Sequence, residues 1–330
     1  MEGKKSSSSN FPCYVIPASH RPCLSPETAN VPVIDLDGLQ WSSSRRPAVV
    51  EEIGNACRRY GFFQCVLDGA FSSAFEFFGL SAEEKVKLMS DDVHKPVKYG
   101  SSLKDGVDKI QFWRVFLKHY AHPLDEWINY WPDNPPTYRE RVGRYTTELR
   151  KLALEITGAI TESLGLGPNY IGPKMEEGMQ VMAVNCYPPC PEPALALGLP
   201  PHSDYSCLTI LLQSRPGLQI MDGEDGKWRE VREIKGALQV HVGDHMEVLS
   251  NGLYKSVMHR ATLNGDRTRV SIASLHSFGM DEKMEAAEEL VGEEGKKRYK
   301  GSSFRDFLKF LAKNDLTEGK NFIDTLKIQV

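Results

Sequence analysis

The chain has 330 residues, of which 41% are hydrophobic and 25% are charged, and this composition is ordinary for a globular protein in water. A net charge of -4 and a pI near 6.2 argue against a nucleic-acid-binding surface. No apolar run approaches the ~18 residues that a membrane-spanning helix needs. The seven cysteines include no C-x-x-C pair, so we interpret them as free thiols, which suit a reducing cytosol.

Helical periodicity dominates the first half of the chain. Residues 1–30 are polar and lack the apolar segment of a secretory signal, so we expect a disordered or extended tail there. The spacing of apolar residues predicts helices over 46–60, 71–88 and 138–164, with Ser81 as a cap inside the second. A short buried strand is predicted at 61–66.

β-Strand patterns take over at about residue 178. They are separated by Gly and Asp turns, and their number and spacing favour a sandwich or barrel. The predicted strands are 180–187, 207–213, 218–221, 228–231, 237–242, 254–263 and 269–278. A final helix follows, with Ser302 or Ser303 as its cap and an apolar face from Phe304 to Leu311. We therefore expect a helical region over 31–177 packed on a mainly β core over 178–330, as one cooperative unit.

A histidine and an aspartate two residues apart stand ahead of the apolar run CLTILLQ. On a strand, His202 and Asp204 would point to one face, where imidazole nitrogen and carboxylate oxygen could share a cation. Of the nine histidines, His259 is the best third ligand because it lies within a predicted strand. An isolated H-x-D is more often a polar turn, and a histidine within a strand is usually a core residue. We interpret His245, after the turn Gly243-Asp244, as a surface or turn histidine.

A second pair of residues supplies complementary chemistry. Arg269 and Ser271 share one face of a predicted strand, and a guanidinium with a neighbouring hydroxyl can bind a carboxylate. An acidic co-substrate could thus chelate a metal at one end and be held by this pair at the other. Two histidines and one carboxylate leave open positions on Fe(II), as in non-haem iron oxygenases.

Three long motifs carry a family resemblance: NCYPPCPEPALALGLPPHSDYSCLTILLQ, GDHMEVLSNGLYKSVMHR and RVSIAS. With VPVIDLDGL and ACRRYGFFQ earlier in the chain, the sequence resembles the plant iron(II)- and 2-oxoglutarate-dependent dioxygenases. It is most similar to the branch with flavanone 3-hydroxylase-like, salicylate-hydroxylating and gibberellin-modifying enzymes. The resemblance implies a double-stranded β-helix, or distorted jelly roll, flanked by N-terminal and C-terminal helices. One departure follows Gln64, where a histidine-glycine usual in relatives is missing and the segment is shortened.

The resemblance also implies roles for particular residues. It makes His202, Asp204 and His259 the iron ligands, and Arg269 and Ser271 the residues that bind the distal carboxylate of 2-oxoglutarate. Asn185 and Tyr187 would line the co-substrate pocket, with Cys186 between them pointing away. Matching positions for the wall of the substrate pocket are Phe116, Trp113, Ala183, Leu275 and Ser277.

The resemblance implies an enzyme that uses Fe(II), 2-oxoglutarate and O2, with stimulation by ascorbate. We expect it to oxidise, most simply to hydroxylate, a small hydrophobic plant metabolite such as a flavonoid, a phenolic or a gibberellin-type hormone, and to release succinate and CO2. We expect a monomer in the cytoplasm, and in the nucleus as a second compartment, with no nucleic-acid or membrane partner. Two alternatives stay open: an iron oxidase that does not use 2-oxoglutarate, and a catalytically silent small-molecule receptor on the same fold.

Overall fold

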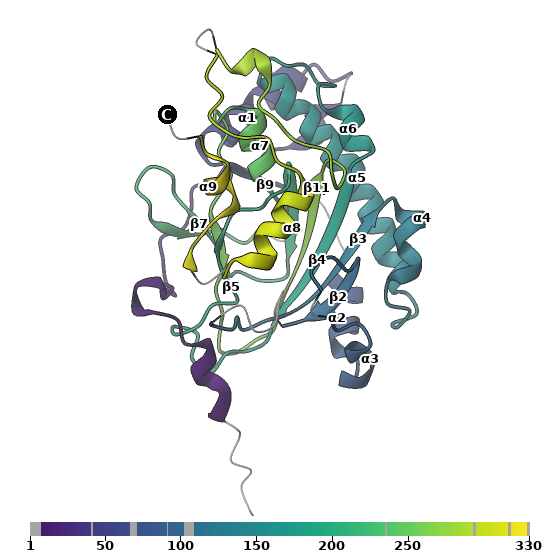
Figure 1. The fold of residues 1–330 in the computed structure, drawn as a ribbon, viewed down its shortest axis with the longest axis vertical. Coiled ribbons are helices and arrows are strands. Elements are labelled where there is room, and N and C mark those ends of the chain that lie inside the picture. The colour runs from purple at the N-terminus through teal and green to yellow at the C-terminus, as the bar shows by residue number, and fades with distance from the viewer. Residues whose placement is uncertain are drawn as a thin grey trace, which may run out of the picture.

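Two antiparallel sheets form the centre of the molecule. The computed structural model describes residues 8–40, 42–66, 71–90, 92–101, 109–234, 236–292, 295–315 and 318–328. Within these residues, the larger sheet has seven strands in the order β1-β9-β6-β11-β4-β3-β2, and the smaller has four in the order β5-β10-β7-β8. Figure 1 shows the strands at the centre, with α5 running along one side and α8 crossing in front. This is the jelly-roll arrangement expected from the sequence.

The described helices and strands follow one another in this order: α1 Arg46–Arg59, β1 Phe62–Val66, α2 Phe71–Gly79, α3 Ala82–Val86, β2 Val97–Gly100, β3 Val115–His122, α4 Leu124–Trp127, α5 Tyr138–Ser163, α6 Gly172–Glu176, β4 Met179–Tyr187, β5 Leu199–His202, β6 Leu208–Gln213, β7 Leu218–Met221, β8 Trp228–Glu230, β9 Ala237–Val242, α7 Asp244–Leu249, β10 His259–Ala261, β11 Arg269–Ser277, α8 Phe304–Lys313 and α9 Phe322–Leu326.

The N-terminal helices cover the outer face of the large sheet. The apolar stripe of α5 is buried at Leu149, Ile156 and Ile160, where it packs against α1 and the sheet in one core cluster. Ile53 of α1 is fully buried in the same cluster. Burial of these side chains removes apolar surface from water at roughly 25 cal/mol per Å². The helices therefore hold the large sheet from behind and leave its inner face to the site.

The register of the strands brings distant segments together at the inner face. His259 in β10 lies opposite His202 in β5, so two histidines far apart in the sequence become neighbours on the small sheet. On the large sheet, Ser271 of β11 lies opposite Asn185 of β4. Side chains directly opposite in an antiparallel pair share one face, which places these residues on the inner surface of the jelly roll.

Several elements differ from those predicted. The strands β2 and β3 extend the large sheet within the half that we expected to be helical. The predicted strand over 254–263 shrinks to β10, and the predicted helix over 71–88 breaks into α2 and α3, with Ser81 accepting a hydrogen bond from the Glu84 amide at the break. Within the stretch predicted as a disordered or extended tail, residues 8–14 form a 3-10 helix that packs Phe11 and Tyr14 on Trp113.

The interpretation of His245 was wrong. This residue lies in α7, where it is fully buried and its ring nitrogens lie 3.4 Å from the Ser277 hydroxyl and 3.3 Å from the Ser302 hydroxyl. Gly243-Asp244 begins this helix and is not an exposed turn. The predicted shortening after Gln64 falls at the end of β1, which pairs with β9. The residues that follow, 67–70, lie outside the described part of the chain.

The C-terminal helices close one side of the β core. Ser303 begins α8 with a capping box, in which its hydroxyl accepts from the Asp306 amide while the Asp306 carboxylate accepts from the Ser303 amide. The helix buries Phe304, Leu308 and Leu311. In Figure 1, α8 and α9 lie together over the strands. No described helix combines the length and the apolar character that crossing a membrane requires.

Candidate metal centre and co-substrate pocket

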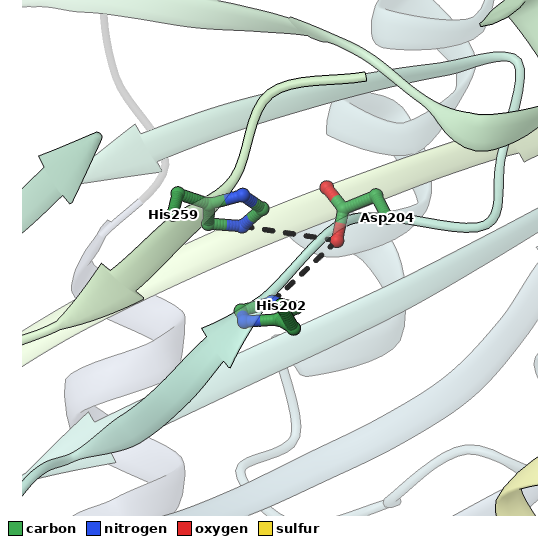
Figure 2. Close-up of side chains that lie close together, drawn as sticks. All are labelled: His202, Asp204 and His259. Atoms are coloured by element: carbon green, nitrogen blue, oxygen red, sulfur yellow. Dashed lines mark ion pairs between the residues drawn. The ribbon is translucent and has the colours of Figure 1, made fainter. Parts of the chain in front are cut away.

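The three predicted ligands converge at the inner face. His202 ends β5, Asp204 lies in the loop after it, and His259 begins β10. The Oδ1 atom of Asp204 is 3.7 Å from His202 Nε2 and 3.8 Å from His259 Nε2, and Figure 2 shows both rings directed at this oxygen. These separations are too long for hydrogen bonds but suit donors that share one ion about 2 Å from each. The donor set therefore fits a divalent metal.

Backbone carbonyls fix the tautomer of both imidazoles. The Nδ1 atom of His202 is 2.8 Å from the Pro200 carbonyl, and that of His259 is 3.1 Å from the Val257 carbonyl. Since a carbonyl only accepts, each Nδ1 carries the proton and donates it. Each Nε2 is left with a lone pair for a metal, which is the usual outer-shell arrangement of ligating histidines.

The surroundings of His202 and Asp204 keep these two residues in the protonation states that a metal requires. Desolvation and the neighbouring His259 lower the pKa of His202 to about 3, so this imidazole is neutral at physiological pH. Burial alone would raise the pKa of Asp204, but the neighbouring imidazoles of His259, His241 and His202 outweigh it and hold that pKa below its usual value. A carboxylate and neutral imidazoles are the forms that bind divalent cations.

His241 approaches the other side of Asp204. It lies on β9, buried to 1% exposure, with Nδ1 3.7 Å from Asp204 Oδ2, the oxygen turned away from the two ligand histidines. The backbone of the same loop is held as well, because the Asp244 amide donates to the Asp204 carbonyl at 2.7 Å. The two carboxylate oxygens thus face different partners, with Oδ1 toward His202 and His259 and Oδ2 toward His241.

Arg269 forms the second anchor of the site. It is 2% exposed; its Nη2 donates to Gln213 Oε1 at 2.8 Å, and its Nε donates to the Arg215 carbonyl at 3.1 Å. The Nη1 group is buried and has no hydrogen-bond partner among the described residues. Burial lowers the pKa of Arg269 from its usual value, but an arginine stays protonated. A buried guanidinium with one unpaired nitrogen fits an incoming carboxylate.

The predicted neighbours of Arg269 surround it. Its guanidinium lies 4.9 Å from the centre of the Tyr187 ring, and Tyr187 is directly opposite on β4. Ser271 lies opposite Asn185, whose side-chain oxygen accepts from Arg114 Nη1 at 2.6 Å. Cys186 points to the other side of the sheet, into a separate core cluster, as expected.

One cavity of about 230 Å³ joins the metal ligands to Arg269. Of the predicted substrate wall, Phe116, Ala183 and Leu275 line it. Two predicted wall residues, Trp113 and Ser277, do not appear among the described residues of the lining. Trp113 packs against Phe11 and Tyr14, and Ser277 lies beside His245 at the end of β11.

Other lining residues had not been predicted. Lys118 comes from β3, a strand that we had not expected, Leu211 comes from β6, and His241 comes from β9. The C-terminal helices α8 and α9 add four phenylalanines: Phe304, Phe307, Phe310 and Phe322. The periodicity of the last helix did signal an apolar face, but that signal could not distinguish a core face from a cavity wall.

Comparison with known families establishes the family to which the chain belongs. Residues 178–277 match the model of the 2OG-Fe(II) oxygenase superfamily, and residues 31–134 match the N-terminal model described as non-haem dioxygenase in morphine synthesis. The chain belongs to the 2OG-Fe(II) oxygenase superfamily. Fe(II), 2-oxoglutarate and O2 are thus the cofactor and co-substrates of this oxygenase.

Curated plant relatives resemble the oxygenase over almost its whole length. It is 48% identical to the rice 2-oxoglutarate-dependent dioxygenase 21, chloroplastic, covering 93% of this chain and 94% of the relative. It is 45% identical to rice flavanone 3-dioxygenase 3, over 95% and 98% of the two chains, and 42% identical to the Arabidopsis thaliana protein DOWNY MILDEW RESISTANCE 6, over 79% and 78%.

A solved structure supports the same fold. The crystal structure of JOX2 in complex with 2OG, Fe and JA superposes on the oxygenase with a TM-score of 0.85 and 31% identity, covering 99% of this chain and 96% of that one. The double-stranded β-helix expected from the sequence is therefore confirmed.

Proposed function

We propose that the oxygenase hydroxylates a small hydrophobic plant metabolite, such as a flavonoid, a phenolic or a gibberellin-type hormone, with release of succinate and CO2. The names of its relatives support a substrate of this size, since rice flavanone 3-dioxygenase 3 is 45% identical. The observation that carries the proposal is the joint placement of the His202, Asp204 and His259 donors and of the unpaired Arg269 Nη1 on one cavity.

In this proposal the chain's own residues hold and orient the reactants. His202, Asp204 and His259 would bind Fe(II), which when bound supplies the site where O2 and 2-oxoglutarate react. Arg269 Nη1 and the Ser271 hydroxyl would take the distal carboxylate of 2-oxoglutarate, while Tyr187 and Asn185 line that end of the cavity. The guanidinium and hydroxyl are preorganised by Gln213 and the sheet, so little order has to be gained on binding.

The apolar wall would exclude water from the reacting end. Phe116, Ala183 and Leu275 on the large sheet line the cavity together with the phenylalanines of α8 and α9. An apolar lining favours a hydrophobic substrate and keeps solvent away from the oxidising centre. We also propose that the protein acts as a monomer in the cytoplasm, where its seven thiols would stay reduced.

Succinate formation tests the reaction. Anaerobically prepared, iron-loaded protein is mixed with 2-oxoglutarate, O2 and a panel of flavonoids, phenolics and diterpenoid acids, and succinate and oxidised product are measured by mass spectrometry. We expect succinate in equal amount to an oxidised product for at least one compound. Product formed with O2 uptake but no succinate would favour the 2-oxoglutarate-independent oxidase, and a chain that binds no iron would favour the receptor.

Removal of a proposed ligand should abolish turnover. We expect His202→Ala and Asp204→Ala to lose more than the roughly 10- to 100-fold that loss of an outer-shell partner costs, because a direct donor to the metal is gone. The readouts are succinate formation and the dissociation constant for Mn(II) measured by calorimetry. His94→Ala is the matched control, because His94 is exposed and lies outside the cavity lining. Full activity of either ligand variant would contradict the assignment.

A further inference from the structure

The inner face of the large sheet presents its side chains to the cavity in rows. In one row, Phe116 lies opposite Asn185, which lies opposite Ser271. The next row begins with Lys118 on β3, and across β4 and β11 it continues with two alanines, Ala183 and Ala273. All three line the cavity. Because an alanine side chain ends at Cβ, this row leaves open space beside the long side chain of Lys118.

Lys118 has an incomplete set of partners. Its Nζ donates to the Val93 carbonyl at 3.0 Å and lies 5.1 Å from the centre of the Tyr120 ring. No carboxylate comes within ion-pair distance of this ammonium group in the part of the chain that the structure describes, and the exposed Asp92 acts on it only from farther away. An ammonium has three N–H donors, so two of them are open to a ligand.

The charge of Lys118 persists at neutral pH although its surroundings oppose it. Burial, and to a smaller extent the neighbouring Lys98, lower its pKa to about 8. The group is therefore still mainly protonated at pH 7. A half-buried ammonium without an anionic partner is unfavourable for the folded protein, and residues kept in such a state at a cavity are candidates for ligand binding.

The remaining charged groups of the cavity are already engaged. Asp204 is the one carboxylate among the described lining residues, and it belongs to the proposed metal centre. The other cations of the lining each donate to, or pair with, a side chain of the protein: Arg114 with Asn185, Arg260 with Gln219, Arg269 with Gln213 and Lys320 with Glu318. Arg269 is further reserved by the proposed function for 2-oxoglutarate. Lys118 thus faces the cavity without an assigned anion.

Another part of the cavity wall is aromatic. Tyr205 stacks on Phe304 and Phe307, with ring centroids 4.5 and 4.4 Å apart, and Phe310 and Phe322 extend this wall. Such a wall suits a flat apolar body, because aromatic rings gain energy from stacked or edge contacts beyond their burial. The cavity therefore combines an apolar surface with the ammonium of Lys118, in addition to the Arg269 guanidinium that the proposed function reserves for 2-oxoglutarate.

We propose that the substrate is a carboxylic acid with a flat, aromatic-like body, and that Lys118 binds its carboxylate while the Phe304–Phe307 wall holds the ring system. The inference rests on the proposed function and narrows its substrate class. A charge-assisted hydrogen bond is shorter and stronger than a neutral one, and the low dielectric of a closed cavity strengthens it further. Lys118 would fix which carbon of the bound acid faces the metal.

Equilibrium binding of two probes of equal shape tests the proposal. The probes are 2-naphthoate and its neutral isostere 2-naphthamide, titrated calorimetrically into full-length protein. Mn(II) in place of Fe(II) and the absence of O2 prevent turnover, and saturating 2-oxoglutarate occupies the Arg269 subsite. We expect wild type to bind the naphthoate about tenfold more tightly than the amide, as expected for one charge-assisted contact. Equal affinities for the two probes would overturn the proposal.

Three variants assign the preference to Lys118. Lys118→Met should abolish the preference for the acid while leaving naphthamide affinity and Mn(II) affinity unchanged, which shows that the fold is intact. Lys118→Arg should retain most of it. Lys320→Met is the matched control, since Lys320 also lines the cavity but already pairs with Glu318, and it should keep the full preference. An equal loss in Lys320→Met would point to a general positive potential and overturn the assignment.

The succinate assay separates this inference from the proposed function. If succinate forms with plant metabolites but wild type does not prefer the acid probe, the reaction stands and the role of Lys118 falls. If the preference exists and depends on Lys118 but no metabolite yields succinate, the anion subsite stands and the proposed reaction falls.

Discussion

The guanidinium of Arg269 determines how the carboxylate of 2-oxoglutarate would be bound. Arg269 offers Nη1 into the cavity while Gln213 and the Arg215 carbonyl hold its other nitrogens. A planar, held fork can take a carboxylate with two parallel hydrogen bonds, whereas the ammonium of a lysine is a shorter-reaching point charge. Binding of the carboxylate therefore depends on the planar shape of the guanidinium as well as on its charge.

Arg269→Lys should accordingly raise the KM for 2-oxoglutarate by roughly tenfold or more, with a smaller effect on kcat, because the fork is lost while the charge stays. Initial rates of succinate formation against 2-oxoglutarate concentration measure it. The exposed Arg267→Lys, two residues away, is the control and should leave KM unchanged. An unchanged KM in Arg269→Lys would mean that another residue binds the co-substrate.

At this scale the sequence predicted the candidate-site residues whose chemistry is unusual in a strand. His202, Asp204, His259 and Arg269 were singled out because charged and imidazole side chains seldom alternate with core residues without a reason, and the structure places the first three together. His241 was not singled out, since its contact with Asp204 Oδ2 arises between β9 and a loop that the sequence separates by more than thirty positions. Such a contact depends on the packing of the sheets, which the local pattern does not contain.

Among the elements, α8 links stability to the cavity. Its capping box joins Ser303 and Asp306, and the helix then presents Phe304, Phe307 and Leu308 to the site. The free energy of the cap therefore contributes to keeping the aromatic wall in place.

Ser303→Ala should lower the free energy of unfolding by about 1 kcal/mol, the usual cost of losing a side-chain N-cap. Urea titration followed by circular dichroism measures this change. Ser101→Ala, at an exposed position outside the helices, is the control. A midpoint that does not move in Ser303→Ala would show that the cap is replaced by another acceptor.

The elements that the sequence did not predict have a common physical cause. β3 is buried on both faces, with Phe116 and Tyr120 toward the cavity side and Leu117 and Ala121 toward the outer core, so the alternation that marks a half-exposed strand is missing. The predicted strand over 254–263 was too long because its first part is bound to Glu247 and not to a neighbouring strand. The Glu247 carboxylate accepts hydrogen bonds from the Ser256 amide and from the Lys255 ammonium. Tertiary contacts decided both cases.

For the whole molecule, the positions of the cysteines provide a way to measure how cooperatively the protein unfolds. Cys13 and Cys23 are exposed, while the other five cysteines are buried in different parts of the structure. Burial raises the pKa of Cys65 and of Cys207 to about 12, which suppresses the reactive thiolate. Cys57 lies on α1 and Cys207 immediately before β6, so the buried set samples both the helical region and the β core.

We expect two thiols of the native, full-length protein to react rapidly with a chromogenic disulfide reagent at pH 8, and the other five to become reactive in one step as urea is added. One step is expected because α1, α5 and the large sheet share a single core cluster, which opposes separate unfolding of the two regions. The control is the total of seven thiols after complete denaturation. Two separated steps would show that the regions over 31–177 and 178–330 unfold independently.

The phenylalanines of α8 and α9 stand last in the chain, after every proposed metal ligand and after the co-substrate anchor. A gene for such an enzyme can therefore exchange its final segment by one recombination event near Gly301 and acquire a new recognition wall while inheriting its oxidising centre untouched. The order of these elements along the chain therefore allows substrate recognition to change by exchange of the C-terminal segment, while the residues of the oxidising centre stay the same.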